Sequence, residues 1–235
     1  MSLTLALLLA AGPSWQPAPA PPPTPWAKAG ARGWAACEDL GRQAAALRGG
    51  TAPRADPGTE EPSVWIERAQ RCPAVPDVIV YAAQLELASA GDIGALLEPD
   101  ASIGAVVKDH QERIERALGW LDRALAECAR RREAPPRETR FLRAYAFVTL
   151  GRAQESEVAL AKAAAAAEVE GWRIARMGAV IALLRGDLDR AMARAHRASI
   201  DAPLEDRVIT RYIRAMVLDR SGAVAAARTE LAELR

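Results

Sequence analysis

Three glycines stand at nearly equal intervals in the second half of this chain. Gly151, Gly186 and Gly222 are 35 and then 36 residues apart. A period of this length is typical of stacked supersecondary units, each of which packs against its neighbours in the sequence. The spacing therefore predicts a repeat array, and the residues around each glycine should match.

Small residues surround each glycine at fixed distances, which are seven residues before it and five and twelve residues after it. In this order the positions hold Ala144, Ala179 and Ala215, then Ser156, Ala191 and Ala227, then Ala163, Ala198 and Leu234. Small side chains allow helices to cross closely, and alanine is the best helix former. Each unit is therefore predicted to be two helices joined at the glycine, which suits the left-handed turn that often ends a helix.

One unit, "LLRGDLDRAMARAHRASIDAP", resembles the tetratricopeptide repeat family. Its turn glycine, two helix-packing alanines and terminal proline are Gly186, Ala191, Ala198 and Pro203. It departs from the family at Ala175 and Gly178, which replace an aromatic residue and a leucine near the start of the first helix. The chain is also rich in alanine and has no sustained alternation of apolar and polar residues, which favours an all-α protein. The resemblance implies a right-handed α-solenoid of stacked helix-turn-helix repeats.

The repeat domain is predicted to cover residues 77–235. The segment 77–92, "DVIVYAAQLELASAGD", has the pattern of a first helix, and its second helix is expected within 112–133. Between them lies an insertion at 93–110, whose apolar residues should pack on the array or on a partner. Residues 33–76 are expected to form a divergent N-terminal helical cap.

The N-terminal sequence predicts export. Residues 1–12, "MSLTLALLLAAG", have the apolar run of a signal peptide but no preceding basic residue. Residues 13–32 read as a Pro/Ala-rich linker, because prolines favour an extended chain that does not pack a core. The expected location is periplasmic or secreted, within the cell envelope. The alternatives are an uncleaved segment that anchors the protein in the inner membrane, and a true start further along the chain.

The chain has three cysteines. If it is exported, Cys37 and Cys72 are candidates for a disulfide between the two cap helices. Such a bond closes a long loop and typically stabilises a protein by a few kcal/mol. Cys128 would then be a buried small apolar side chain.

No motif in the sequence predicts catalysis, a metal site or a cofactor. The two histidines, His110 and His196, are far apart in the sequence, and no zinc, phosphate-binding or nucleophile motif occurs. An enzyme is therefore not expected, although a site in the 93–110 insertion is an alternative. Arginines cluster in residues 128–143, but acidic residues interrupt them and the net charge is +1, so nucleic-acid binding is not expected either.

The resemblance implies a concave side lined by the first helix of each unit. The fifth residues of these helices are Tyr81, Phe141, Arg176 and Tyr212, and one helical turn later stand Leu85, Tyr145, Val180 and Met216. Aromatic residues and arginine are enriched at binding hot spots. The alternative is that these side chains fill the space between neighbouring helices.

The sequence therefore predicts a non-enzymatic protein–protein interaction module that binds a peptide or protein partner on its concave face. The residues predicted to contact the partner are Tyr81, Phe141, Tyr145, Arg173, Arg176, Tyr212 and Met216. Arg173 and Arg176 are expected to meet an acidic group. The alternative function is a membrane-anchored intracellular accessory or regulatory subunit, which would contact the membrane only through its N-terminal segment.

Overall fold

The computed structural model describes residues 31–49, 62–90 and 103–233 of the chain. Within these residues it contains ten α-helices and no strand, which confirms the predicted all-α class. The chain divides into two compact units, residues 1–36 and 37–235. Of the first unit the structure describes only residues 31–36, which begin the first helix.

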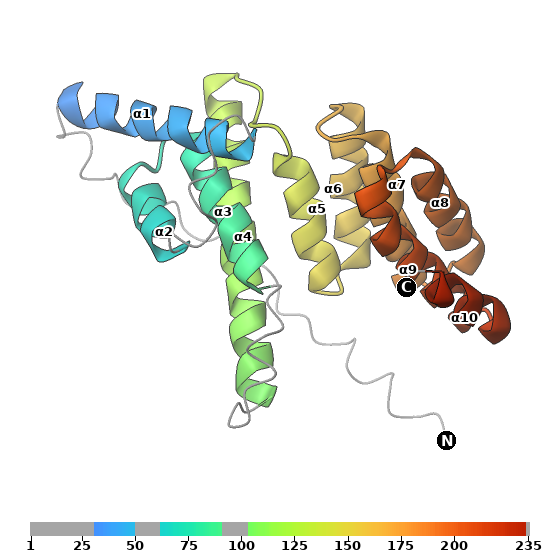
Figure 1. Cartoon of the computed structure of the whole chain (residues 1–235). Coiled ribbons are helices and arrows are strands. Elements are labelled where there is room, and N and C mark those ends of the chain that lie inside the picture. The colour runs from blue at the N-terminus through green and yellow to red at the C-terminus, as the bar shows by residue number, and fades with distance from the viewer. Residues whose placement is uncertain (1–30, 50–61, 91–102, 234–235) are drawn as a thin grey trace. The chain divides into compact units, whose positions relative to one another are not determined.

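The helices are joined by short connections over most of the second unit (Figure 1). Their bounds are α1 (Ala31–Arg48), α2 (Pro62–Arg71), α3 (Pro76–Ala90), α4 (Ile103–Arg131), α5 (Thr139–Thr149), α6 (Ala153–Ala165), α7 (Gly171–Leu184), α8 (Leu188–Asp201), α9 (Leu204–Arg220) and α10 (Val224–Ala232).

Two helices begin earlier than the sequence predicts. Helix α1 starts at Ala31, within the linker predicted for 13–32. Helix α4 starts at Ile103, so residues 103–110 of the predicted insertion belong to this helix. No proline interrupts the 29 residues of α4, and a helix can therefore run through them. The predicted signal segment 1–12 and residues 93–102 of the insertion lie outside the described residues.

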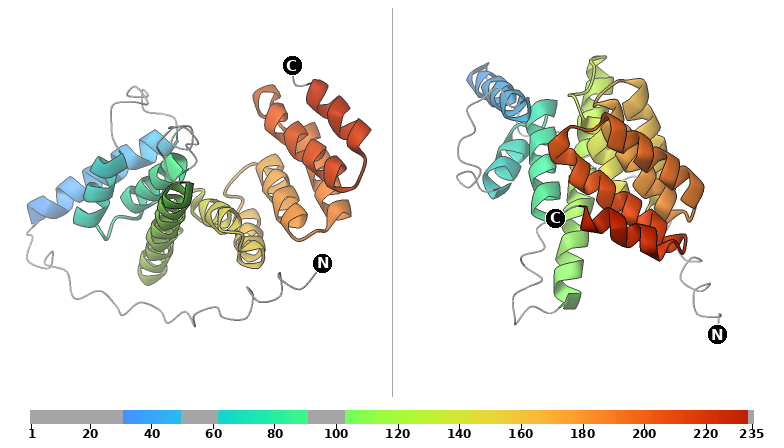
Figure 2. Two further views of the ribbon diagram at one scale, coloured as in Figure 1. Left: turned by 90° about the horizontal axis from the view of Figure 1, so that it is seen from below. Right: turned by 45° about the vertical axis from the view of Figure 1, so that its right-hand side comes forward.

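Consecutive helices of the second unit pack as pairs. The closest packing is between α3 and α4, α5 and α6, α7 and α8, and α9 and α10, and Figure 2 shows the last three pairs following one another. The odd-numbered helices also touch one another in sequence order, α3 with α5, α5 with α7, and α7 with α9. Side chains that face the same way on these helices can therefore form one continuous surface.

Glycine ends the first helix of three pairs. Gly151, Gly186 and Gly222 have φ angles of 72°, 76° and 84°, in the left-handed region that glycine adopts without strain. In each case the glycine N–H donates to the carbonyl three residues earlier, and the next N–H donates to the carbonyl five residues before it. These two bonds form the Schellman motif, which satisfies the last carbonyls of the helix.

The same turn occurs at two residues that are not glycine. Arg132 follows α4 with φ 59°, and Ala167 follows α6 with φ 48°. The next residues, Glu133 and Glu168, donate their N–H groups to the carbonyls of Cys128 and Ala163. Sequence reasoning missed these turns because only glycine marks a left-handed residue clearly.

Small residues occupy the helix crossings of the array. Eight of the nine positions predicted from the repeat are at most 4% exposed, and the ninth, Leu234, lies outside the described residues. The eight are Ala144, Ser156, Ala163, Ala179, Ala191, Ala198, Ala215 and Ala227. Ser156 also donates a hydrogen bond from its hydroxyl to the carbonyl of Ala144, at 2.7 Å. A larger side chain at these positions would push neighbouring helices apart.

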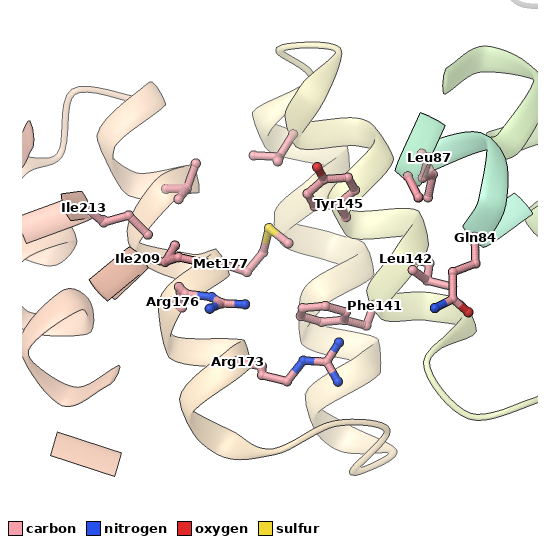
Figure 3. A pocket seen from close by; sticks show the side chains of 13 residues that line it. Gln84, Leu87, Phe141, Leu142, Tyr145, Arg173, Arg176, Met177, Ile209 and Ile213 are labelled. Atoms are coloured by element: carbon pink, nitrogen blue, oxygen red, sulfur yellow. The ribbon is translucent and has the colours of Figure 1, made fainter. Parts of the chain in front are cut away.

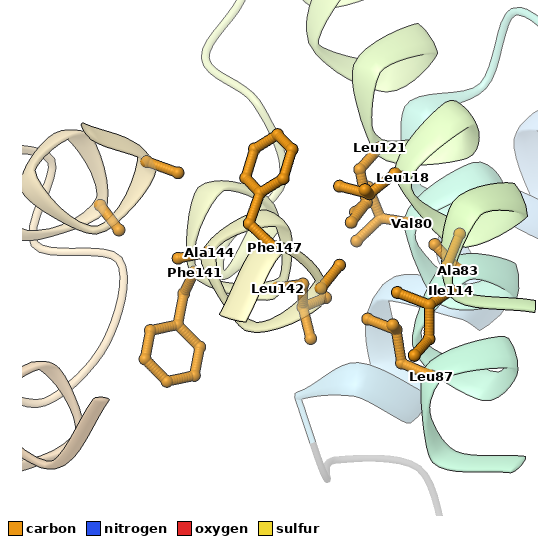
Figure 4. Packing of buried hydrophobic residues seen from close by; sticks show 14 of the residues in the cluster. Val80, Ala83, Leu87, Ile114, Leu118, Leu121, Phe141, Leu142, Ala144 and Phe147 are labelled. Atoms are coloured by element: carbon orange, nitrogen blue, oxygen red, sulfur yellow. The ribbon is translucent and has the colours of Figure 1, made fainter. Parts of the chain in front are cut away.

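The largest apolar core lies where the α3–α4 pair meets α5. Figure 4 shows Val80 and Leu87 from α3, Leu121 from α4, and Leu142 and Phe147 from α5 within this cluster. All five are less than 10% exposed. This core fixes α5, from which the remaining pairs continue.

A second core, which we call the N-terminal cluster, joins α1, α2 and α3. Its buried members are Cys37, Ala44, Trp65, Ala69, Cys72, Val75, Val78 and Ala82. Trp65 is 1% exposed, and its ring packs nearly perpendicular to the Tyr81 ring, with 4.6 Å between the ring centroids. A disulfide with an S–S distance of 2.03 Å joins Cys37 on α1 to Cys72, which directly follows α2.

Candidate binding groove

Helices α3, α5, α7 and α9 line an open pocket of about 500 Å³ (Figure 3). Four helices contribute to its lining, which makes it a groove across the array. The lining residues are Gln84, Leu87 and Ala88 from α3; Phe141, Leu142, Tyr145 and Val148 from α5; Arg173, Arg176, Met177 and Val180 from α7; and Ile209 and Ile213 from α9. Most of these side chains are apolar.

The repeat explains why these side chains meet. Leu142, Met177 and Ile213 are 35 and then 36 residues apart, which is the spacing of the turn glycines. Equivalent positions on stacked units point the same way, so each odd-numbered helix adds a side chain to the same surface. Tyr145 and Val180 repeat this relation one helical turn further along.

Arg173 is held in place by the chain itself. Its guanidinium donates to the Glu138 carboxylate at 2.6 Å and lies 4.7 Å from the centre of the Phe141 ring. Burial lowers the pKa of Arg173, but the hydrogen bond and charge of Glu138 outweigh this effect, and its pKa is raised above the ordinary value. The residue is thus a fixed cation at the edge of the groove.

Arg176 has a similar arrangement one turn along α7. It donates to the Asp206 carboxylate at 3.0 Å, and its guanidinium stacks 4.8 Å from the centre of the Trp172 ring. The sequence predicts that Arg173 and Arg176 meet an acidic group. In the structure, acidic groups of the chain already occupy both positions, which the sequence could not indicate because Glu138 and Asp206 are about 30 residues away.

Among the described residues, two side chains of the lining offer polar groups that make no hydrogen bond. Gln84 lies beside Leu142 and Leu87 in Figure 3. Tyr145 lies near Met177, and 39% of its surface is exposed. Within the described part of the chain, neither the Gln84 amide nor the Tyr145 hydroxyl makes a hydrogen bond. The amide can both donate and accept, and so can the hydroxyl.

The structure brings together four of the seven residues predicted to contact a partner, which are Phe141, Tyr145, Arg173 and Arg176. The other three do not line the groove. Tyr81 packs on Trp65. Met216 packs against a buried cluster formed by α7, α8 and α9, and Tyr212 is 52% exposed on α9.

Sequence reasoning missed much of the lining, which includes Gln84, Leu87, Ala88, Leu142, Val148, Met177, Ile209 and Ile213. The repeat register could have found Leu142, Met177 and Ile213, because each directly follows a predicted fifth residue. The side chain next to a predicted position also faces the groove, since a helix turns 100° per residue and exposes a stripe rather than a line.

The arginine-rich stretch at 128–143 is largely paired with carboxylates. Arg130 and Arg131 bond to Glu127, while Arg140 bonds to Glu168 and Arg143 to Asp122. Glu168 is 5% exposed and also accepts from the backbone N–H groups of Arg140 and Phe141, at 2.8 and 3.2 Å. These acidic partners hold the start of α5 and compensate much of the local positive charge.

The described residues contain no group of three or more His, Cys, Asp or Glu side chains placed to hold a metal ion. His110 bonds through Nδ1 to the carbonyl of Ala90, and His196 is exposed. Cys128 is 2% exposed, and burial raises the pKa of its thiol, which suits a packed side chain rather than a nucleophile. Among the described helices, none has both the length and the apolar character needed to cross a membrane.

Comparison with known proteins gives no relative for this chain. No family model matches it, and no significantly similar protein was found among curated proteins or solved structures.

Proposed function

We propose that this chain is a non-enzymatic interaction module whose groove across α3, α5, α7 and α9 binds a segment of a partner protein. The observation that carries this proposal is the groove itself, a mainly apolar pocket of about 500 Å³ to which four successive units contribute. Pockets that bind ligands are concave, mostly apolar and provided with a few polar groups, as this one is.

The architecture proposed with this function is a tetratricopeptide-like array that winds as a right-handed solenoid. Its support is the pairing of the helices, the repeated glycine turns and the buried small residues at the repeat positions. In such arrays the first helices of the pairs provide the binding surface.

An exported location belongs to the same proposal. The disulfide between Cys37 and Cys72 supports it, because such bonds persist in oxidising compartments and are rare in the cytosol. The bond also favours this location over an intracellular accessory subunit. Alkylation of free thiols in intact cells tests it, and modification of both cysteines without prior reduction would contradict export.

Photo-crosslinking in the cells that produce the protein tests the binding proposal. A photoreactive residue replaces Tyr145 in the groove, and a second variant carries it at Val158, which is 52% exposed on α6 and does not line the groove. We expect a protein crosslinked at position 145 alone.

The substitution Ala88→Arg should abolish that product, because it places a long side chain inside the groove from an exposed position on α3. Its matched control is Ala193→Arg, at an exposed alanine of α8 away from the lining. Equal crosslinking at positions 145 and 158, or a product that persists in Ala88→Arg, would contradict binding in the groove.

A further inference from the structure

The dimensions of the groove limit what can enter it. It crosses four neighbouring helices, and packed helices are spaced 8–10 Å apart, so its length is roughly 25 Å. An extended chain of about eight residues covers this length. A helix satisfies most of its main-chain groups internally, whereas a buried extended segment needs partners for them. The groove is therefore long enough for an extended segment, and side chains that can pair with a main chain would favour that form over a helix.

The charges at the groove are already balanced. The lining contains two charged residues, Arg173 and Arg176, and each is paired with a carboxylate of the chain. An acidic ligand would have to displace Glu138 or Asp206 from its partner, and a basic ligand would meet two guanidinium groups. Electrostatic complementarity therefore favours a segment without charge.

The polar groups of the lining that have no partner among the described residues match a peptide main chain. The peptide unit offers one N–H donor and one C=O acceptor, and each must find a partner when a segment is buried. The Gln84 amide and the Tyr145 hydroxyl can supply both kinds of partner. They come from α3 and α5, next to the apolar residues that would receive side chains.

We propose that the groove takes an uncharged, extended segment of a partner protein. Apolar side chains of the segment enter between α5, α7 and α9, while Gln84 and Tyr145 hydrogen-bond its main chain. This inference rests on the proposed binding function and specifies the chemistry of the partner.

Selection from random 12-residue peptides displayed on phage tests the inference, with the full oxidised chain as the target. Two variants separate groove binding from other binding. Ile209→Lys changes a groove residue that is 52% exposed, and Ile200→Lys changes an isoleucine of α8 that is 62% exposed and outside the lining. We expect peptides that bind the wild type and Ile200→Lys but bind Ile209→Lys about 10-fold more weakly, as loss of one apolar contact implies.

The recovered peptides should lack charged residues and carry apolar residues at alternate positions, the period of an extended chain. Their affinity should change less than 2-fold between 50 and 500 mM NaCl, because no ion pair with the peptide is screened. Enrichment of Asp or Glu, or apolar residues at helical spacing, would overturn the inference.

The hydroxyl of Tyr145 gives a sharper readout. Tyr145→Phe should weaken peptide binding about 5-fold through loss of one hydrogen bond, while Tyr212→Phe, at an exposed tyrosine outside the groove, should leave it unchanged. Equal affinities in the two variants would show that Tyr145 does not bind the main chain.

The failures of the two proposals can be told apart. In one outcome, the protein crosslinked at position 145 disappears in Ala88→Arg, but the phage selection returns acidic peptides or no peptide. This outcome supports the binding function and rejects the uncharged extended segment. Loss of the groove-dependent crosslink rejects both.

Discussion

The N-terminal cluster and the array of α5–α10 are held together by different kinds of contact. The cluster joins α1, α2 and α3 through a disulfide and large rings, such as Trp65 against Tyr81. The array joins neighbouring helices through alanines at the crossings, through turn bonds within a few residues and through arginine–carboxylate pairs between units. One region depends on a few large contacts, and the other on many small ones that recur with the repeat.

This difference predicts how each region responds to change. Loss of one contact in the N-terminal cluster removes a large share of what holds α1 to α2 and α3. In a repeat array the stability is approximately a sum over units and their interfaces, so a local change should weaken one interface and leave the others nearly intact.

The largest effect is expected from removal of the disulfide. Replacing both Cys37 and Cys72 with alanine should lower the free energy of unfolding by about 3–4 kcal/mol, from the entropy of a loop of this length in the unfolded chain. Denaturant titration measures the loss, and the wild type under reducing conditions provides the control. Hydrogen exchange should accelerate in α2 and α3 but not in α8. A loss below 1 kcal/mol would mean that the cluster does not depend on the bond.

Overpacking one helix crossing tests the array in the same way. Ala198→Leu, at a fully buried alanine of α8, should cost about 1–3 kcal/mol because the added atoms have no space to enter. Ala193→Leu on the exposed side of α8 should change stability by less than about 0.5 kcal/mol. If the two variants unfold at the same denaturant concentration, close packing at the alanine positions does not stabilise the array.

The array could be predicted from the sequence because its determinants are local. The residue type of Gly186 alone indicates a left-handed turn, and that of Ala198 indicates a close helix crossing. The same residue types recur with the period of the repeat. The start of α4 could not be predicted, because the residues before 112 have no repeat partner that would mark them as helical. The turn at Ala167 was missed for a related reason, since its residue type gives no signal of a left-handed conformation.

The candidate site was predictable only in part. The repeat register found Phe141, Tyr145 and Arg176, and Arg173 was expected beside Arg176 as a second cation. It did not find the carboxylates that pair with the arginines, because such contacts join side chains of different units and depend on three-dimensional packing. Tyr81 was placed on the same face by its register, but the large Trp65 ring of the N-terminal cluster packs against it instead.

Two substitutions in opposite directions, glycine to alanine and alanine to glycine, measure how much the left-handed turns contribute to stability. Gly186→Ala should destabilise the protein by about 1 kcal/mol, because its φ of 76° is costly for a residue with a Cβ atom. Ala167→Gly, at φ 48°, should stabilise it by up to about 1 kcal/mol for the same reason. Thermal unfolding of both variants checks the signs. Effects of the same sign in the two variants would show that the left-handed turns are not what limits stability there.

The smallest effect concerns the contact between α4 and the N-terminal cluster. Glu127, near the end of α4, accepts hydrogen bonds from Arg130 and Arg131, and Arg131 also bonds to the carbonyl of Ala74 before α3. The pKa of Glu127 is lowered from 4.5 to about 2, chiefly by the hydrogen bond from Arg130. Burial opposes the shift, and the hydrogen bond from Arg131 and the charges of both arginines contribute to it. A carboxyl whose pKa is lower in the folded state stabilises the protein above the unfolded pKa, and this stabilisation is lost as the pH falls towards the folded pKa.

Glu127→Gln should therefore cost about 0.5–1 kcal/mol at pH 7, the range of a partly exposed ion pair, and progressively less between pH 4.5 and 2. Thermal unfolding of both proteins at stepwise lower pH measures the difference. Glu112→Gln is the control, because Glu112 pairs with Lys108 at 3.8 Å on an exposed face of α4, and loss of such a pair should cost less than about 0.5 kcal/mol at pH 7. A difference that stays constant with pH would mean that Glu127 stabilises this contact through its shape rather than through its charge.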